Sequence, residues 1–312
     1  MADITLPYVQ GLTAQVRTEF NQWLQAAPSE YDRISMTMTS SSAENLYPRL
    51  DEIAGLREWI GDRVIQELSG GAFVIRNRTF EGTVGLKRED MEDDQYSFFL
   101  PGIQQLGRNA ALMPDRLVFK ALGQGTTQKC FDGQYYFDTD HQTSDENGSW
   151  VPYSNIGVPQ GTEGAGPAWY LFDTTQPLKP MIFQRRRPFT IVPRTKLDDD
   201  NVFFGNRFIW GVDGRCNAGY GLWQLAYRST RPLTPESYSA ARAIMQAQRR
   251  HDGEPYDIDP NLLVVPTNLE EQGRTVLKAA LVAATNGTAT VSNVWVNSAE
   301  LVVSKRLSQN PG

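Results

Sequence analysis

The N-terminal 45 residues contain one stretch with helical periodicity and one with strand-like alternation. In residues 13–27 (TAQVRTEFNQWLQAA) apolar side chains recur at steps of three and four, which predicts an amphipathic helix that ends before Pro28. The apolar positions are Val16, Phe20, Trp23 and Leu24. In the polar stretch that follows, Ile34, Met36 and Met38 alternate with polar residues, which favours a strand or an arm laid across another surface.

Residues 64–90 (VIQELSGGAFVIRNRTFEGTVGLKRED) have the pattern of two long strands joined around Gly70 and Gly71. Their apolar residues fall on both faces of the expected ribbon. They are Val64, Ile65, Phe73, Val74, Ile75, Phe80, Val84 and Leu86. Because an isolated two-stranded ribbon is marginally stable at best in water, we expect it to pack on a partner surface in its own chain or in a neighbouring one.

The strongest helical pattern follows this ribbon. Carboxylates in REDMEDD precede a run in which Ile103, Leu106, Ala110, Met113, Leu117 and Ala121 recur at steps of three and four. Gly123 and Gly125 supply the stop. At about 1.5 Å per residue the helix would span roughly 40 Å, and Pro101 and Pro114 are expected to kink or break it.

The remaining chain predicts a mixed α+β protein. Residues 126–168 are rich in turn formers, and the segment up to residue 230 has strand-like patches between turns. Helical patterns return at 235–251 and 269–284, and short apolar runs at 261–266 and 299–307 favour strands. There is no internal repeat.

Composition narrows the class of protein. With 312 residues, 40% of them hydrophobic, the chain can build one large or two medium cores. A net charge of −6 argues against a general electrostatic nucleic-acid binder. We find no apolar run long enough for a membrane span and no signal-peptide pattern, so we expect a soluble cytosolic origin. Cys130 and Cys216 are expected to be reduced.

Few residues offer chemistry. The two histidines lie in no hydrolase or metalloprotease motif, and GQGTT at 123–127 lacks the ending of a phosphate loop. Asp132, Asp138, Asp140 and His141 could bring oxygen ligands and an imidazole together, but a turn with capping carboxylates is the simpler interpretation. We therefore assign no catalytic, cofactor-binding or metal site, and expect no cofactor.

One basic cluster stands out in this acidic chain, QRRRP at 184–188. Its arginines, Arg185, Arg186 and Arg187, could contact DNA or a carboxylate patch on a neighbouring chain. The second interpretation is preferred, because a single cluster is too little for binding to the nucleic-acid backbone.

Several long sequence blocks resemble the major head subunit of Mu-like tailed phages and prophages. They occur in order from about residue 12 to 307. The blocks are APSEYDRISM, LREWIGDRVIQEL, RNRTFEGTVGLKREDMEDD, ALMPDRLVFKAL, CFDGQYYFDTDH, KPMIFQRRRP, DDDNVFFGNRFIWG and AGYGLWQLA.

The resemblance implies the α+β Hong Kong 97-type phage capsid fold. Residues 1–45 would form the N-terminal arm and 57–90 the extended β-hairpin loop. Residues 91–125, with the spine helix, and 151–232 would be mainly peripheral domain. Residues 126–150 and 233–307 would be mainly axial domain.

The resemblance also implies a function in the phage head. The chain would be a major capsid protein that self-assembles through hexamers and pentamers into an icosahedral shell in the bacterial host cytoplasm and ends in the virion. Its partners would be copies of itself, a separate scaffolding protein, a portal, a decoration protein, and packaged double-stranded DNA without sequence-specific contacts; no membrane is involved. The expected contacts between subunits are Trp59, Arg63, Phe73, Arg76, Arg78, Phe80, Glu81, Arg185, Arg186 and Arg187.

Two alternatives remain open from the sequence. An encapsulin-like compartment shell shares the fold and would enclose protein cargo. A metal-dependent enzyme would use the cluster from Asp132 to His141.

Overall fold

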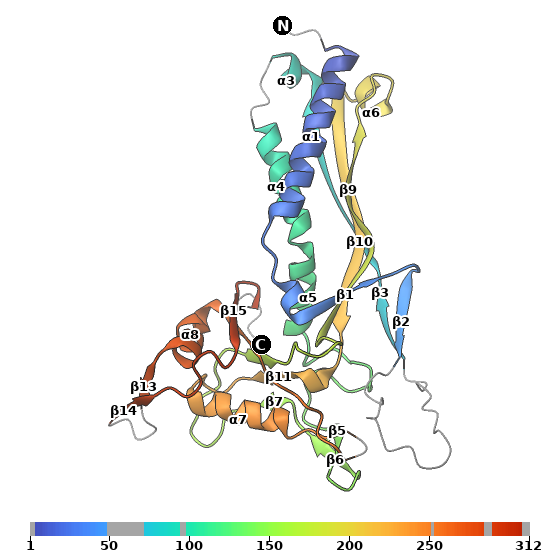
Figure 1. The fold of residues 1–312 in the computed structure, drawn as a ribbon. Coiled ribbons are helices and arrows are strands. Elements are labelled where there is room, and N and C mark those ends of the chain that lie inside the picture. Colours follow the sequence, from blue (N-terminus) through green and yellow to red (C-terminus); the bar gives the residue numbers. More distant parts are fainter. Residues whose placement is uncertain (1–3, 49–71, 94–97, 251–252, 284–288, 308–312) are drawn as a thin grey trace.

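The computed structural model describes residues 4–48, 72–93, 98–250, 253–283 and 289–307. It shows a tall module of sheet and helices standing on a more compact module (Figure 1). Trp59, Arg63 and residues 64–71 of the expected ribbon lie outside the described residues.

The tall module is built on a four-stranded sheet with one face covered by helices (Figure 1). Its strands, in spatial order, are β1 (Ser35–Thr39), β9 (Met181–Arg194), β10 (Arg207–Tyr220) and β4 (Arg78–Lys87). β10 pairs antiparallel with both of its neighbours, whereas β1 runs parallel to β9. Alternation along β10 buries Phe208, Trp210 and Val212 under the helices, as expected for a sheet with one covered face.

The two edges of this sheet differ. β1 pairs only with Met181–Arg185, and no described strand pairs with β9 from Arg186 to Arg194 on that side. This open stretch contains Pro188 and Pro193, which have no backbone N–H to donate. β4 forms the opposite edge along its whole length and contains no proline.

Three helices cover the sheet. They are α1 (Leu6–Ala26), α4 (Phe99–Ala111) and α5 (Met113–Gly123). α1 begins earlier than the sequence pattern predicts, because Pro7 fits a first helical turn and Val9 and Leu12 extend the buried stripe. The predicted long helix is interrupted at Leu112, two residues before Pro114, which confirms the break expected there, whereas Pro101 lies in the first turn of α4.

α1 and α4 approach each other closely at Gly107. A Cβ atom built on Gly107 would stand 2.6 Å from the backbone oxygen of Phe20. At Gly102, one and a half turns earlier in the same helix, a Cβ atom would meet nothing within 4 Å. Only glycine at position 107 therefore permits this helix crossing.

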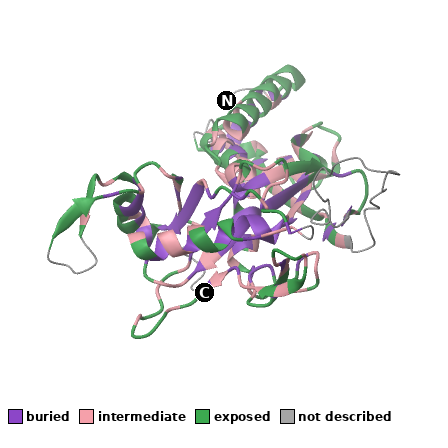
Figure 2. Cartoon of the chain, turned by 60° about the horizontal axis from the view of Figure 1, so that its bottom comes forward, coloured by how far each residue is buried: buried purple, intermediate pink, exposed green. Residues whose placement is uncertain are grey.

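The compact module is built around a five-stranded sheet. In spatial order its strands are β15 (Glu300–Ser304), β12 (Leu262–Pro266), β8 (Trp169–Phe172), β11 (Ala226–Ser229) and β7 (Ile156–Gly157). Every residue of β12 and β8 is buried, and the buried strands fill the centre of the module in Figure 2. α7 (Pro235–Gln246) and α8 (Glu270–Lys278) flank the sheet, and α7 begins with a capping box of Thr234 and Ser237.

The segment 151–232 passes between the two modules more than once. β7, β8 and β11 of this segment lie in the compact sheet, whereas β9 and β10 lie in the tall one. The assignment of peripheral and axial domains along the sequence stays a prediction.

Three two-stranded ribbons and several short helices complete the described chain. The ribbons are β2 (Glu44–Pro48) with β3 (Ala72–Arg76), β5 (His141–Ser144) with β6 (Trp150–Tyr153), and β13 (Leu281–Ala283) with β14 (Thr290–Ser292). The short helices are α2 (Tyr31–Ile34), α3 (Arg88–Glu92), α6 (Asp200–Phe203) and the 3-10 turns Trp223–Leu225 and Thr267–Leu269.

The structure corrects part of the predicted ribbon. Residues 72–76 pair with β2, and residues 78–87 pair with β10 of the same chain. Phe80 and Val84 pack partly buried against the core of their own chain, and Leu86 is buried there. Strand β10 and the helices of the same chain thus supply part of the partner surface that this segment needs, and its contacts with neighbouring chains stay a prediction.

Candidate functional site

The expected contact residues that the structure describes lie on β3, β4 and β9. β3 and β4 are separated only by Asn77, and β10 lies between β4 and β9. The long sheet thus brings residues about a hundred positions apart in sequence onto strands that both pair with β10.

Two successive rungs of the sheet carry arginines. Arg187 on β9 is opposite Arg215 on β10, and on the next rung Arg185 and Arg78 flank Cys216. Two register shifts in the β9–β10 pairing fall at this point, and such bulges re-aim side chains. We call Arg78, Arg185, Arg186, Arg187 and Arg215 the arginine row.

Sequence reasoning missed Arg215. It stands alone in GVDGRCNAG, so no cluster marks it. The only available signal was its place in a strand with period-two burial, and its position opposite Arg187 depends on a register that the sequence does not give.

The arginine row is incompletely paired. Arg187 forms an ion pair with Asp213, and Nη1 of Arg186 donates to the backbone oxygen of Ser40 at 3.2 Å. The guanidinium of Arg78 lies 5.8 Å from the ring centre of Phe80. No carboxylate partner occurs for Arg78 or Arg185 within the described ranges, and Nε of Arg215 is buried without a hydrogen bond.

The β2–β3 ribbon has one sheltered face and one open face. Tyr47 and Ile75 pack on Ile182 of β9, and Phe73 is partly buried beside them. Leu46 and Val74, opposite each other on the other face, are 69% and 42% exposed. This outer pair therefore remains available to a second surface.

The polar candidates on β3 and β4 are exposed. Nε of Arg76 lies 2.8 Å from Oε2 of Glu44 across the ribbon, yet its side chain is 83% exposed. Glu81 is exposed beside Asp213 and accepts a hydrogen bond from the Thr83 hydroxyl at 3.1 Å. The exposed ion pair contributes little to stability.

The far end of the long sheet is acidic. α3 and α6 both lie at this end (Figure 1), and Nδ2 of Asn206, in the turn between α6 and β10, donates to Oε1 of Glu89 at 3.1 Å. We call the carboxylates in and beside these two helices the acidic tip. They are Glu89, Asp90, Glu92, Asp93, Asp198, Asp199 and Asp200.

Part of the acidic tip is satisfied internally. Glu92 pairs with Arg88 at 2.9 Å, and Asp199 accepts a hydrogen bond from the backbone N–H of Lys196 at 2.9 Å. Four of its carboxylates have neither a cation partner nor a side-chain hydrogen bond in the part of the chain that the structure describes. They are Asp90, Asp93, Asp198 and Asp200.

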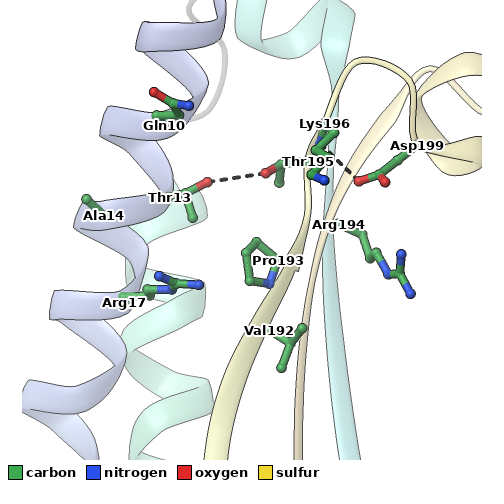
Figure 3. A pocket seen from close by; sticks show the side chains of 10 residues that line it. All are labelled: Gln10, Thr13, Ala14, Arg17, Val192, Pro193, Arg194, Thr195, Lys196 and Asp199. Carbon is green, nitrogen blue, oxygen red and sulfur yellow. Dashed lines mark hydrogen bonds between the residues drawn. The ribbon is translucent and has the colours of Figure 1, made fainter.

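An open groove of about 600 Å³ lies between α1 and the end of β9 (Figure 3). Its lining residues are Gln10, Thr13, Ala14, Arg17, Val192, Pro193, Arg194, Thr195, Lys196 and Asp199. The hydroxyls of Thr13 and Thr195 approach to 3.5 Å across it (Figure 3). The groove has no nucleophile with an adjacent base, so its residues do not form a catalytic constellation.

The Asp132–His141 cluster is a buried structural unit. Nδ1 of His141 lies 2.8 Å from Oδ2 of Asp132, and the imidazole stacks on Trp223 at 4.0 Å. Desolvation opposes ionisation of Asp132, but hydrogen bonds from His141 and Cys130 outweigh it and lower its pKa. Asp138 instead accepts backbone hydrogen bonds in its own turn. No group of three or more potential metal ligands occurs among the described residues.

Comparison with known proteins places this geometry in a family. A family model described as "Mu-like prophage major head subunit gpT" matches residues 9–307. The chain belongs to this family. Over 307 residues it is 39% identical to the major capsid protein of Escherichia phage Mu, covering 97% of this chain and 99% of that protein. It is 36% identical over 288 residues to the Mu-like prophage FluMu major head subunit of Haemophilus influenzae, covering 90% and 92%.

Solved structures agree with the family. The chain superposes on a procapsid chain of bacteriophage JBD30 with a TM-score of 0.81 at 37% identity, covering 97% of this chain and 100% of that one. For a chain of the JBD30 capsid the TM-score is 0.75 at 27% identity, covering 98% and 100%. The resemblance seen in the sequence blocks is thus confirmed, and the fold is the α+β Hong Kong 97-type capsid fold.

Family membership decides the class of function. Members of the gpT family are structural head subunits, so the chain is a major capsid protein of the Mu-like type and not an enzyme. The metal-dependent enzyme considered from Asp132 and His141 is not supported. Within the described ranges, no helix has the length and apolar character needed to cross a bilayer.

Proposed function

We propose that this gpT-family chain self-assembles through hexamers and pentamers into the closed icosahedral head of a tailed phage. The full-length similarity to the JBD30 procapsid chain carries the proposal. In this proposal the shell assembles in the host cytoplasm around a separate scaffolding protein, incorporates a portal, and encloses double-stranded DNA without reading its sequence. A decoration protein is a further partner, since a JBD30 capsid structure is described as decorated with minor capsid protein trimers.

The exposed contacts of the monomer are individually weak, which suits reversible assembly. Fully burying an aliphatic side chain contributes about 1.5–3 kcal/mol, so Leu46 and Val74, already partly covered, contribute less than this each. Association costs roughly 4–15 kcal/mol. One ribbon contact is therefore marginal, and a closed shell becomes stable because each subunit makes several contacts at once.

The contact residues of this proposal are the exposed ones on the sheet and ribbon. Arg76, Arg78, Glu81, Arg185, Arg186 and Arg187 provide polar contacts, and the partly buried Phe73 and Phe80 contribute apolar ones. Trp59 and Arg63 remain proposed contacts on sequence grounds.

The direct test is electron microscopy of particles from a bacterial host that expresses the chain with a scaffolding protein. We expect closed shells of uniform size, and particles from phage-producing cells should carry a tail and DNA. Shells filled with protein cargo and lacking a tail would favour the encapsulin-like alternative. Soluble monomers with no shells at any concentration would contradict the proposal.

A further inference from the structure

The long sheet exposes the face that points away from α1, α4 and α5. From Thr79 to Lys87 of β4, every odd-numbered residue is exposed and every even-numbered one is buried or half-buried. The β4–β10 register places the odd-numbered residues of β10 beside them on the same face. We call the odd-numbered residues 81–87 of β4 and 207–213 of β10 the open face.

Two rungs of the open face pair like charges. Lys87 lies opposite Arg207, and Glu81 lies opposite Asp213. Like charges in direct opposition destabilise a sheet. Among the described residues, the sole ion pair of these four side chains joins Asp213 to Arg187. The chain thus keeps a basic and an acidic rung six residues apart, which is about 20 Å along a strand at about 3.3 Å per residue.

Gly211 lies between these rungs, and its own chain does not require a glycine there. The nearest atom to a Cβ atom built on Gly211 would be Oγ1 of Thr83, at 3.8 Å. On every other glycine of β4 and β10, a Cβ atom would come within 2.9 Å of a side chain of the same chain. A glycine inside a strand weakens it and often marks the close approach of another chain segment. Gly211 therefore points to a neighbour outside the subunit.

We propose that the open faces of two subunits pack on each other around a twofold axis. This inference rests on the proposed assembly function and specifies one of its interfaces. A twofold contact requires a surface that is complementary to itself. If the axis crosses the strands at the paired residues Val84 and Trp210, the basic rung of each subunit lies over the acidic rung of the other.

One register satisfies both charge and size. Lys87 faces Glu81 of the second subunit, and Arg207 faces its Asp213. The same axis places Ile209 opposite Gly211, so the isoleucine side chain of each subunit enters the space that the glycine of the other leaves open. Opposed charges of this kind fix the orientation of two partners.

The pattern favours a second copy over other partners. The acidic rung would repel the phosphates of DNA, and a scaffolding or decoration protein would leave the self-complementarity of the open face unused. A contact about 20 Å long is small beside the interfaces of stable dimers. It becomes stable in a closed shell, where each subunit makes further contacts at the same time.

Charge reversal tests this register in the full chain, expressed with a scaffolding protein. Lys87→Glu and Glu81→Lys should each lower the yield of closed particles roughly tenfold or more, because each places like charges face to face. The double variant should recover most of the yield, since the exchanged charges again oppose each other. Each reversal also removes a like-charge pair within the sheet, so unassembled subunits should unfold at the wild-type temperature or above it.

Crosslinking identifies the partner. In shells of a Lys87→Cys and Glu81→Cys double variant, a bismaleimide of about 10 Å, the spacing of stacked sheets, should join subunits into covalent dimers and nothing longer. It cannot span the roughly 20 Å between the two positions of one chain. The native Cys130 and Cys216 are buried. Neither single cysteine variant should give dimers, because each position faces the other one across the axis.

Gly211→Val tests the fit of sizes. Valine favours a strand and has room in its own chain, so the subunit should be at least as stable as wild type. Particle yield should fall roughly tenfold or more, because the new side chain occupies the space of Ile209 of the second subunit. Arg108→Glu on α4 is the control, an exposed charge away from the open face, and should leave the yield unchanged.

Three outcomes overturn the inference. They are a full particle yield from both single reversals, a double reversal no better than either single one, and crosslinked ladders or no dimers in place of dimers alone. A loss of yield without rescue, in folded subunits, would assign the open face to the scaffolding protein. An absence of wild-type shells would refute the proposed function itself, whereas shells that fail these tests would refute only this interface.

Discussion

Substituting Gly107 by alanine tests the close crossing of α1 and α4. In an exposed helix interior a glycine-to-alanine substitution stabilises the folded protein by about 1 kcal/mol, because alanine loses less backbone entropy than glycine on folding. Here the new methyl group would stand 2.6 Å from the backbone oxygen of Phe20 and 3.2 Å from Cβ of Trp23. Overpacking of this kind typically lowers the free energy of unfolding by about 1–3 kcal/mol. Because the nearest atom belongs to the backbone of Phe20 and cannot rotate away as a side chain could, we expect the upper part of that range. We expect a net loss of about 2 kcal/mol.

Gly102→Ala is the matched control in the same helix. Its Cβ atom would meet no neighbour, so it should raise the free energy of unfolding by about 0.5–1 kcal/mol. Urea denaturation of unassembled subunits, followed by circular dichroism, measures both variants against wild type. If Gly107→Ala stabilised the subunit as much as Gly102→Ala does, α1 would not pack on α4 at the described distance.

Three further predictions concern buried or paired groups. Oδ1 of Asp115 accepts hydrogen bonds from two backbone N–H groups at the start of α2, at 2.9 and 2.8 Å. Asp115→Ala should therefore lower the free energy of unfolding, measured in urea, by about 2–4 kcal/mol. Asp115→Asn keeps an acceptor oxygen and should lower it clearly less. Burial raises the pKa of Cys216 to about 11 and that of Cys130 still further. A thiol reagent at pH 8 should therefore label both cysteines only as fast as the subunit unfolds. Rapid labelling of the folded subunit would refute this. Hydrogen bonds from Arg231 lower the pKa of Glu163 from its ordinary 4.5 to about 2, so the pair stabilises fully above pH 4.5 and its contribution is lost as pH falls toward 2. Glu163→Gln should therefore flatten unfolding free energy against pH in that window, and an unchanged acid slope would contradict the assignment.

The helices were predictable because their signals are local. The stripe from Val16 to Leu24 identifies α1, and the period-three and period-four run with Pro114 identifies the interrupted α4 and α5. The start of α1 was missed although Val9 and Leu12 continue the steps of three and four that lead to Val16, because Pro7 and Gly11 weaken the helical signal there.

Pairing between strands was not predictable, since it depends on contacts far apart in sequence. The strand pattern at 72–87 was recognised, but its pairing with β2 and β10 requires residues up to about 140 positions away. The same limit hid Arg215, whose neighbours Arg187 and Thr79 are fixed only by the register of the sheet. QRRRP was noticed because its charges are consecutive, and this sequence signal led to the larger row.

The two prolines on the open stretch of β9 restrict how subunits can meet. Strand addition needs a continuous series of backbone donors and acceptors, and Pro188 and Pro193 interrupt the donors at two points in nine residues. A newly made subunit thus presents one sheet border that resists uncontrolled joining to other chains during synthesis. The border formed by β4 contains no proline, and no described strand covers it, so productive growth and accidental aggregation are both expected to begin on that side.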